Sequence, residues 1–270
     1  MVSTAAPYFG VRADRAANAL GLRYESVSFQ TPDGITLRGW YFPSDFPDSP
    51  AILYAPSTAN DQRSGLSLVK PLHSAGFNVL LFSYRGYGRS DGSPIGFSYG
   101  AHESLDVDGA VRYLREVRGA SMVGAIGHSA GAVAIILSAA RNPGINVVVA
   151  ASPFASVEEI WNTNKPDFMP TPVYNIMMRT SELRKDFERS QVRPVDVISL
   201  IAPRPILILH GTDDKRITQE QAQVLFDQAK EPKEFWLLEG LSHGKVRSVG
   251  IETRIRDVIQ FLDNAFHPIP

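Results

Sequence analysis

The sequence predicts an α/β protein in which helices cover both faces of a mainly parallel central sheet. Short, almost wholly apolar runs recur along the chain, as expected of strands that are buried on both faces of a sheet. Amphipathic stretches separate most of these runs, which is how crossover helices connect parallel strands. With 270 residues, of which 44% are hydrophobic, the chain is long enough for one large domain, which we expect to span residues 1–270.

The elements follow from this pattern in chain order. Residues 24–31 and 35–43 are predicted to be strands that form a hairpin across the Pro-Asp-Gly turn at 32–34. Further strands are predicted at residues 51–55, 77–84, 121–127, 145–154, 204–211 and 233–240. Helices are predicted at residues 64–76, 98–117, 130–142, 218–230 and 252–266.

Residues 155–200 interrupt the alternation, because they are more than one crossover helix requires. The segment is rich in aromatic, Met and Pro residues: Trp161, Phe168, Met169, Pro170, Pro172, Tyr174, Met177 and Met178. One interpretation is a set of helices packed on the sheet. The other is a small lid within the same domain, whose flexible Met and aromatic side chains line a pocket.

Composition excludes several classes of protein. The formal net charge of −1 and the pI near 6.6 argue against a nucleic-acid-binding protein that relies on a basic surface. Without cysteine the chain has neither disulfides nor thiolate metal sites. No apolar run is long enough for a membrane span, and the first 27 residues lack the apolar core of a secretory signal. We therefore expect a cytoplasmic protein, with no indication of its oligomeric state.

Gly-His-Ser-Ala-Gly at 127–131 matches the G-x-S-x-G nucleophile elbow. The motif requires a strand before it and a helix after it, and both are predicted here. The sharp turn holds the serine in a strained conformation, and the positions of Gly127 and Gly131 must be nearly free of side chain for the chain to pack. Ser129 is therefore the predicted nucleophile, and the N-terminus of the following helix offers N–H groups to a developing oxyanion.

A serine hydroxyl needs a base, and the base needs an orienting carboxylate. In this elbow arrangement the acid and then the histidine follow the serine, each just beyond a strand. The turn after the strand at 204–211 supplies Asp214, with Asp213 as the alternative because a one-residue shift would exchange them. His243 lies in a Gly-flanked loop after the last strand and is the predicted base.

The other histidines are weaker candidates for a catalytic or metal-binding role. His128 is expected to be structural and His210 to order its loop. His102 and Asp106 stand four residues apart, a spacing that metals can use, but we interpret them as a solvated helix face. No compact set of three or four ligands appears, so we predict no metal and no cofactor.

The chain resembles the α/β-hydrolase superfamily from about residue 25 to 266, in its serine-aminopeptidase-like and esterase-like branch. The resemblance rests on GHSAG at 127–131, HGTDDKRIT at 210–218 and LSHG at 241–244, in that order, with SYRGYGRSDGSP at 83–94 in addition. It implies the fold and the triad. It says little about the substrate, because the superfamily includes esterases, thioesterases, peptidases and dehalogenases.

The sequence departs from this family after the strand at 51–55. Relatives usually carry His-Gly there, and the next main-chain N–H forms half of the oxyanion hole. Here Ala55-Pro56 stands in that place, and Pro56 has no N–H to donate. By alignment, the resemblance implies Ser57 as the donor, paired with the amide of Ala130, and Thr58 is the alternative.

These observations favour a hydrolase that cleaves carboxylic esters of small to medium acyl groups through an acyl-enzyme on Ser129. The partner expected is a small-molecule ester. Aminopeptidase-like and thioesterase activities are alternatives, and Glu158 or Glu159 would be the anchor for a free amino terminus. A module that keeps the fold but only binds a ligand is a further alternative, supported by the Ala55-Pro56 departure.

Overall fold

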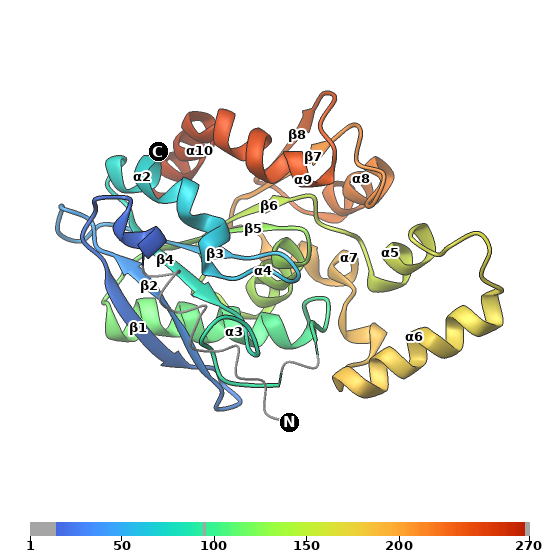
Figure 1. Ribbon diagram of the computed structural model, residues 1–270. Coiled ribbons are helices and arrows are strands. Elements are labelled where there is room, and N and C mark those ends of the chain that lie inside the picture. The colour runs from blue at the N-terminus through green and yellow to red at the C-terminus, as the bar shows by residue number, and fades with distance from the viewer. Residues whose placement is uncertain (1–14, 94–95, 268–270) are drawn as a thin grey trace.

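The computed structural model describes residues 15–93 and 96–267. Residues 1–14, 94–95 and 268–270 lie outside this description. The prediction that the N-terminal segment is not a secretory signal falls partly on these residues. The centre is an eight-stranded sheet in the order β1-β2-β4-β3-β5-β6-β7-β8 (Figure 1). Its strands are β1 (Glu25–Gln30), β2 (Thr36–Phe42), β3 (Ala51–Ala55), β4 (Asn78–Ser83), β5 (Val123–His128), β6 (Val147–Ala151), β7 (Ile206–Gly211) and β8 (Lys233–Leu238).

Strand direction follows the chain connections. β1 pairs with β2, and β2 with β4, in antiparallel fashion, as the predicted hairpin requires. All other neighbouring strands are parallel. The predicted mainly parallel α/β fold is confirmed. The carboxyl ends of β5, β7 and β8 therefore meet at one edge of the sheet, where ligands bind in such folds.

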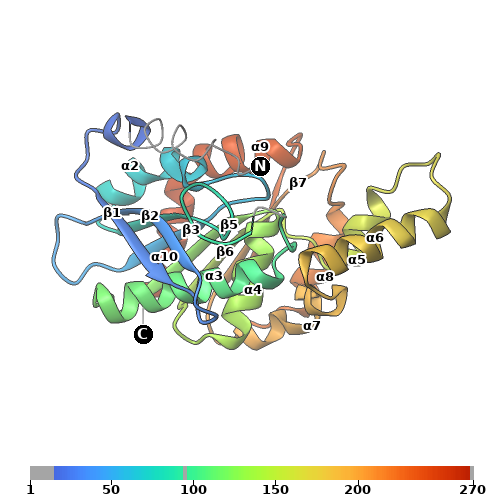
Figure 2. The same ribbon diagram turned by 60° about the horizontal axis from the view of Figure 1, so that its bottom comes forward.

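Helices cover both faces of the sheet (Figures 1 and 2). The main ones are α2 (Leu66–Ser74), α3 (Ala101–Arg112), α4 (Ala130–Arg141), α8 (Gln219–Gln228) and α10 (Ile255–Phe266). One core cluster joins the sheet to α3, α4 and α8, and the other joins it to α2 and α10. β3 serves both, since Leu53 faces the first cluster while Ile52 and Tyr54 face the second. Within the described part of the chain, no helix has the length and apolarity needed to cross a membrane.

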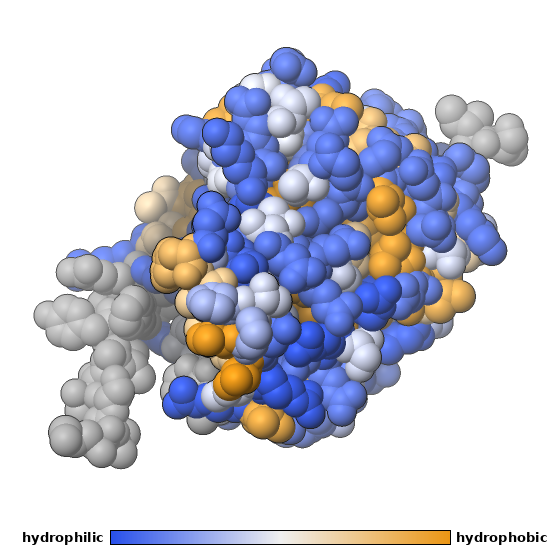
Figure 3. All heavy atoms as spheres, turned by 90° about the vertical axis from the view of Figure 1, so that its right-hand side faces the viewer, coloured by the Kyte–Doolittle hydropathy of each residue, from blue (hydrophilic) through white to orange (hydrophobic). Residues whose placement is uncertain are grey.

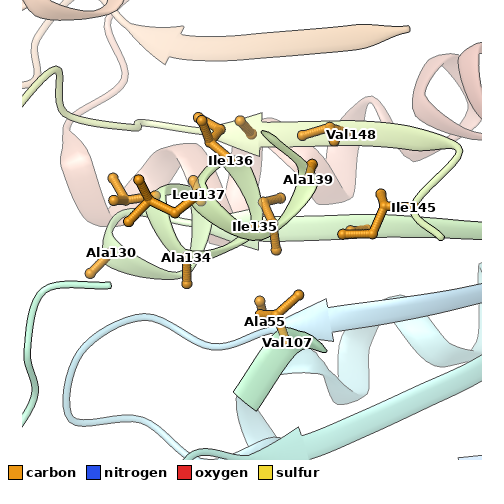
Figure 4. Close-up of a cluster of buried hydrophobic side chains, with 14 of the residues drawn as sticks. Ala55, Val107, Ala130, Ala134, Ile135, Ile136, Leu137, Ala139, Ile145 and Val148 are labelled. Carbon is orange, nitrogen blue, oxygen red and sulfur yellow. The ribbon is translucent and has the colours of Figure 1, made fainter. Parts of the chain in front are cut away.

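Helix α4 is buried along most of its length. Its residues Ile135, Ile136 and Ala139 are inaccessible to solvent and belong to the same cluster as Val148 of β6 (Figure 4). Burial of each large aliphatic side chain contributes about 1.5–3 kcal/mol. This packing fixes the N-terminus of α4, and with it the turn that carries Ser129.

The helix predicted over 98–117 is shorter and not uniform. It begins at Ala101, because Gly100 has a φ of 121° that no helix accepts, and Glu103 Oε2 accepts the N–H of Gly100 at 2.9 Å. After Arg112 the chain winds into a π-helical turn over Tyr113–Val117. The apolar spacing predicted the buried face correctly for Val107, Ala110, Val111 and Leu114, but Val117, which shares the spacing, is 69% exposed. It also missed both of these local changes.

Residues 155–200 form α5 (Val157–Thr163), α6 (Thr171–Lys185) and the short α7 (Pro194–Val197). In Figures 1 and 2 α5 and α6 extend beyond the sheet on its right-hand side. Figure 3 views this side and shows apolar patches among polar side chains. The exposed large apolar residues of the segment are Phe168, Val173, Ile176, Met177, Leu183 and Leu200. The function of residues 155–200 as a lid stays a prediction.

Candidate active site

Ser129 stands in the turn between β5 and α4. Its backbone angles, φ 57° and ψ −125°, lie in a region that L residues with side chains rarely adopt. The main-chain N–H of Ser129 donates to the carbonyl of Ala151 at 2.8 Å, which ties the turn to the neighbouring strand. Only 8% of the residue is exposed. The serine is thus held in a strained conformation by the packing around it.

The two glycines of the motif are required by close backbone contacts. A Cβ on Gly127 would lie 2.6 Å from the carbonyl oxygen of Gly131. A Cβ on Gly131 would lie 2.3 Å from the carbonyl oxygens of both Ala55 and Pro56. The start of α4 therefore packs directly on the end of β3, and only glycine fits at this contact.

Asp214 follows β7 in a tight turn, where its N–H donates to the carbonyl of Gly211 at 3.1 Å. Its Oδ1 accepts the main-chain N–H groups of Arg216 and Ile217, each at 3.0 Å. Burial acts to raise the pKa of this carboxyl, but the hydrogen bonds from His243 and Ile217 outweigh it and hold the pKa below its ordinary value. The side chain is fully buried and carries a negative charge at neutral pH.

His243 begins the short helix α9 (His243–Lys245), which follows β8. Its Nδ1 lies 2.7 Å from Oδ2 of Asp214, and its Nε2 lies 3.0 Å from Oγ of Ser129. Since the carboxylate can only accept, Nδ1 carries the proton and Nε2 is free to accept the serine proton. The structure brings these three side chains together in one hydrogen-bonded chain. Asp213, by contrast, is exposed.

Two further histidines, His128 and His210, bind main-chain carbonyls of the segments that carry His243 and Asp214. His128 Nε2 donates to the main-chain carbonyl of His243 at 3.0 Å, and the two rings lie 4.9 Å apart between centroids. Burial lowers the pKa of His128 to about 3, and His243 and Arg247 add to the effect. His210 Nε2 donates to the carbonyl of Ile217 at 3.1 Å, within the turn that carries Asp214.

The predicted oxyanion donors lie near the contact between β3 and α4. Ala130 is the first residue of α4, where the helix itself provides no acceptor for the N–H. Ser57 is half-buried, and its carbonyl and Oγ accept hydrogen bonds from Asn60 at 3.2 Å and 2.9 Å. Thr58, the alternative, lines the pocket beside Ser129. The assignment of Ser57 stays a prediction.

A pocket of about 280 Å³ opens at Ser129. Its walls are formed by Thr58, Tyr99, Ser129, Ala130, Phe154, Ile160, Trp161, Asn164, Tyr174, Met178 and Arg216. Trp161, Tyr174 and Met178 are among the residues for which the sequence suggested a pocket lining, whereas Phe168 is 85% exposed. The sequence analysis missed Arg216 and Asn164. Only the position of Arg216, two residues after Asp214, could have indicated from the sequence that it lies near the site.

The interpretation of His102 and Asp106 as a solvated helix face was wrong for Asp106. This side chain is fully buried, and its carboxylate binds the guanidinium of Arg85 at 2.7 Å. His102 Nε2 lies 2.7 Å from the carbonyl of Asp186. Within the described residues, no group of three or more His, Asp or Glu side chains is arranged to hold a metal ion.

Comparison with known proteins places the chain in a family. Residues 65–268 match the model of the prolyl oligopeptidase family. The chain belongs to this family. The protein YfhR of Escherichia coli is 30% identical over 229 residues, which cover 81% of this chain and 73% of YfhR. Protein bem46 of Schizosaccharomyces pombe is 30% identical over 211 residues, 76% of this chain and 65% of bem46.

Solved structures show the same fold. An esterase of Pyrococcus furiosus superposes with a TM-score of 0.72 at 23% identity, covering 91% of this chain and 92% of the esterase. The 2,6-dihydroxy-pseudo-oxynicotine hydrolase superposes with a TM-score of 0.72 at 17% identity, covering 94% of this chain and 71% of that hydrolase. The predicted membership of the α/β-hydrolase superfamily is confirmed, and the protein is an α/β hydrolase of the serine-hydrolase type.

Proposed function

We propose that this protein hydrolyses carboxylic esters of small to medium acyl groups through an acyl-enzyme on Ser129. The observation that carries the proposal is the hydrogen-bonded chain from Asp214 through His243 to Ser129, at 2.7 Å and 3.0 Å, beside a largely apolar pocket. A pocket of about 280 Å³ is at the small end of ligand sites, which favours short acyl groups.

The proposed reaction has two halves. His243 Nε2 takes the Ser129 proton as Oγ attacks the ester carbonyl, and the N–H groups of Ala130 and Ser57 stabilise the oxyanion. The protonated imidazole then gives its proton to the departing alkoxide, which leaves as an alcohol. Water attacks the acyl-enzyme with His243 again as base, and the proton returns to Ser129 Oγ as the carboxylic acid leaves. The buried charge of Asp214 stabilises the imidazolium in both halves.

The charges around the pocket argue against the aminopeptidase alternative. Glu158 is paired with Arg193 at 3.1 Å, and neither Glu158 nor Glu159 lines the pocket. Arg216 does line it, and this cation repels a free amino terminus. Among the described lining residues there is therefore no acidic anchor of the kind that such a peptidase requires.

A hydrolysis profile over 4-nitrophenyl esters of increasing chain length, thioesters and aminoacyl amides tests the proposal. We expect the highest kcat/KM on short esters, with Ser129→Ala lowering it by at least about 10³-fold, because removal of a triad member leaves only oxyanion stabilisation and binding. Undiminished ester hydrolysis by Ser129→Ala would contradict the proposal. A preference for thioesters or amides would reassign the substrate while leaving the nucleophile in place.

A further inference from the structure

The pocket beside Ser129 has one charged side chain among its described lining residues, that of Arg216. The rest of the wall is aromatic, aliphatic or neutral polar, and no Asp or Glu is part of it. Arg216 is an exposed residue at the edge of this wall, so its charge acts through partly solvated space and favours an anionic ligand over a cationic one.

The guanidinium of Arg216 makes no ion pair and no hydrogen bond within the described part of the protein. Several arginines are ion-paired, among them Arg85 with Asp106, Arg141 with Asp108, and Arg189 with Glu182. Arg216 thus differs from these in offering a free cation at the site.

The backbone of Arg216 is fixed from both sides. Its N–H donates to Oδ1 of Asp214 at 3.0 Å, and its carbonyl accepts the side-chain amide of Asn164 at 2.9 Å. One contact ties it to the predicted catalytic acid, and the other to the residue that caps the C-terminus of α5. The side chain therefore starts from a defined point beside the nucleophile, and its own flexible stem lets the guanidinium follow a ligand.

A second unused donor lines the same pocket. Trp161 is only 5% exposed, and its indole N–H has no acceptor within the described structure. Buried donors are normally satisfied, so an indole N–H without an acceptor on a residue of the pocket wall is compatible with a ligand that carries acceptor oxygens. The preference for a negatively charged ligand comes from Arg216, and Trp161 adds a neutral donor.

We propose that Arg216 binds a carboxylate carried by the substrate, so that the preferred esters are half-esters of dicarboxylic acids. This inference rests on the proposed ester hydrolysis by Ser129 and specifies its substrate class. The methylene chain of the acyl group packs against the apolar wall, and its terminal carboxylate meets the guanidinium. Arginine suits this task because its planar N–H groups can bind both carboxylate oxygens.

The test compares two esters of the same size. Mono-4-nitrophenyl glutarate carries the carboxylate, and 4-nitrophenyl 5-methylhexanoate replaces it with a neutral isopropyl group. We expect the charged ester to have the higher kcat/KM in the wild type, after subtraction of spontaneous hydrolysis. Arg216→Ala should lower the charged-to-neutral ratio about tenfold, as is typical for a lost charge-assisted hydrogen bond, and Arg216→Lys should restore part of it, because lysine keeps the charge and loses the bidentate geometry.

Lys215→Ala is the matched control, because it removes the neighbouring positive charge from an exposed side chain that does not line the pocket. Its ratio should equal that of the wild type. An unchanged ratio in Arg216→Ala would overturn the inference. An equal fall in both variants would also overturn it, because the effect would then come from overall charge.

A binding measurement tests the role of Arg216 without requiring ester hydrolysis. Calorimetric titration of free glutarate into Ser129→Ala should give a Kd that rises about tenfold when Arg216→Ala is added. Equal affinity in the two proteins would contradict the role of Arg216 even if ester hydrolysis proceeds. Conversely, Arg216-dependent glutarate binding without Ser129-dependent hydrolysis would support the anion site and contradict the proposed reaction.

Discussion

Nδ1 of His243 lies 2.7 Å from Oδ2 of Asp214, while the other carboxylate oxygen accepts two main-chain N–H groups. The carboxylate therefore cannot rotate without losing three hydrogen bonds. The imidazole is held in the tautomer that leaves Nε2 free for Ser129. This relationship gives the proposed mechanism its first prediction.

Asp214→Asn should lower kcat by about 10³- to 10⁴-fold, because an amide can hold His243 in the wrong tautomer and cannot stabilise an imidazolium. Asp213→Asn is the matched control, since Asp213 is exposed and differs by one position. It should retain activity to within about twofold. Steady-state hydrolysis of a short 4-nitrophenyl ester measures both. If Asp213→Asn is the damaging change, the assignment of the acid is wrong.

The buried imidazole of His128 predicts how stability depends on pH. Its pKa of about 3 is below the ordinary value of 6.5, so between these pH values the unfolded chain binds a proton that the folded protein does not. Stability from this group is present above pH 6.5 and is lost as the pH falls, by about 1.4 kcal/mol per unit. Nearby His243, Arg247 and Asp214 also act on it.

Comparison with His128→Gln isolates this contribution, because glutamine keeps a donor for the carbonyl of His243 and does not titrate. Urea unfolding from pH 8 to pH 4.5 should give a difference in unfolding free energy, wild type minus variant, that is constant above pH 7 and falls below pH 6.5. A difference that stays constant over the whole range would show that His128 is not held neutral by the fold.

Gly131→Ala should destabilise the protein by about 1–3 kcal/mol, because the new Cβ would meet two carbonyl oxygens of the main chain at 2.3 Å. The shift needed to relieve this contact would also move the segment that carries Ser57. Gly244→Ala is the control, as its Cβ would meet nothing within 4 Å. Thermal unfolding of both variants makes the comparison, and equal melting temperatures would contradict the close approach of α4 to β3.

The features that the sequence predicted best are local. The apolar run of β5, the glycines around Ser129 and the following helix lie within about 20 consecutive residues, and their pattern predicts the turn directly. The choice between Asp213 and Asp214 depends on one position in a turn. The three-dimensional arrangement favours Asp214, which is buried against His243 while Asp213 is exposed, and the assignment of the acid stays a prediction.

The features that the sequence did not predict depend on distant contacts. Asp106 is polar and helical, yet it is buried because Arg85 reaches it from another element. Asn164 of the insert and Arg216 of the turn after β7 are 52 residues apart in the chain and meet at the pocket wall, where the side-chain amide of Asn164 donates to the carbonyl of Arg216. Neither the contact of Arg85 with Asp106 nor that of Asn164 with Arg216 can be recognised from a periodic pattern in the sequence.

Reaction with a fluorophosphonate probe tests the central claim most directly, because such probes modify only an activated serine. Mass spectrometry of the digested wild type should locate one adduct, on Ser129, and the adduct should be absent from Ser129→Ala. Folded wild-type protein that stays unmodified, or that is modified at another serine, would contradict Ser129 as the nucleophile.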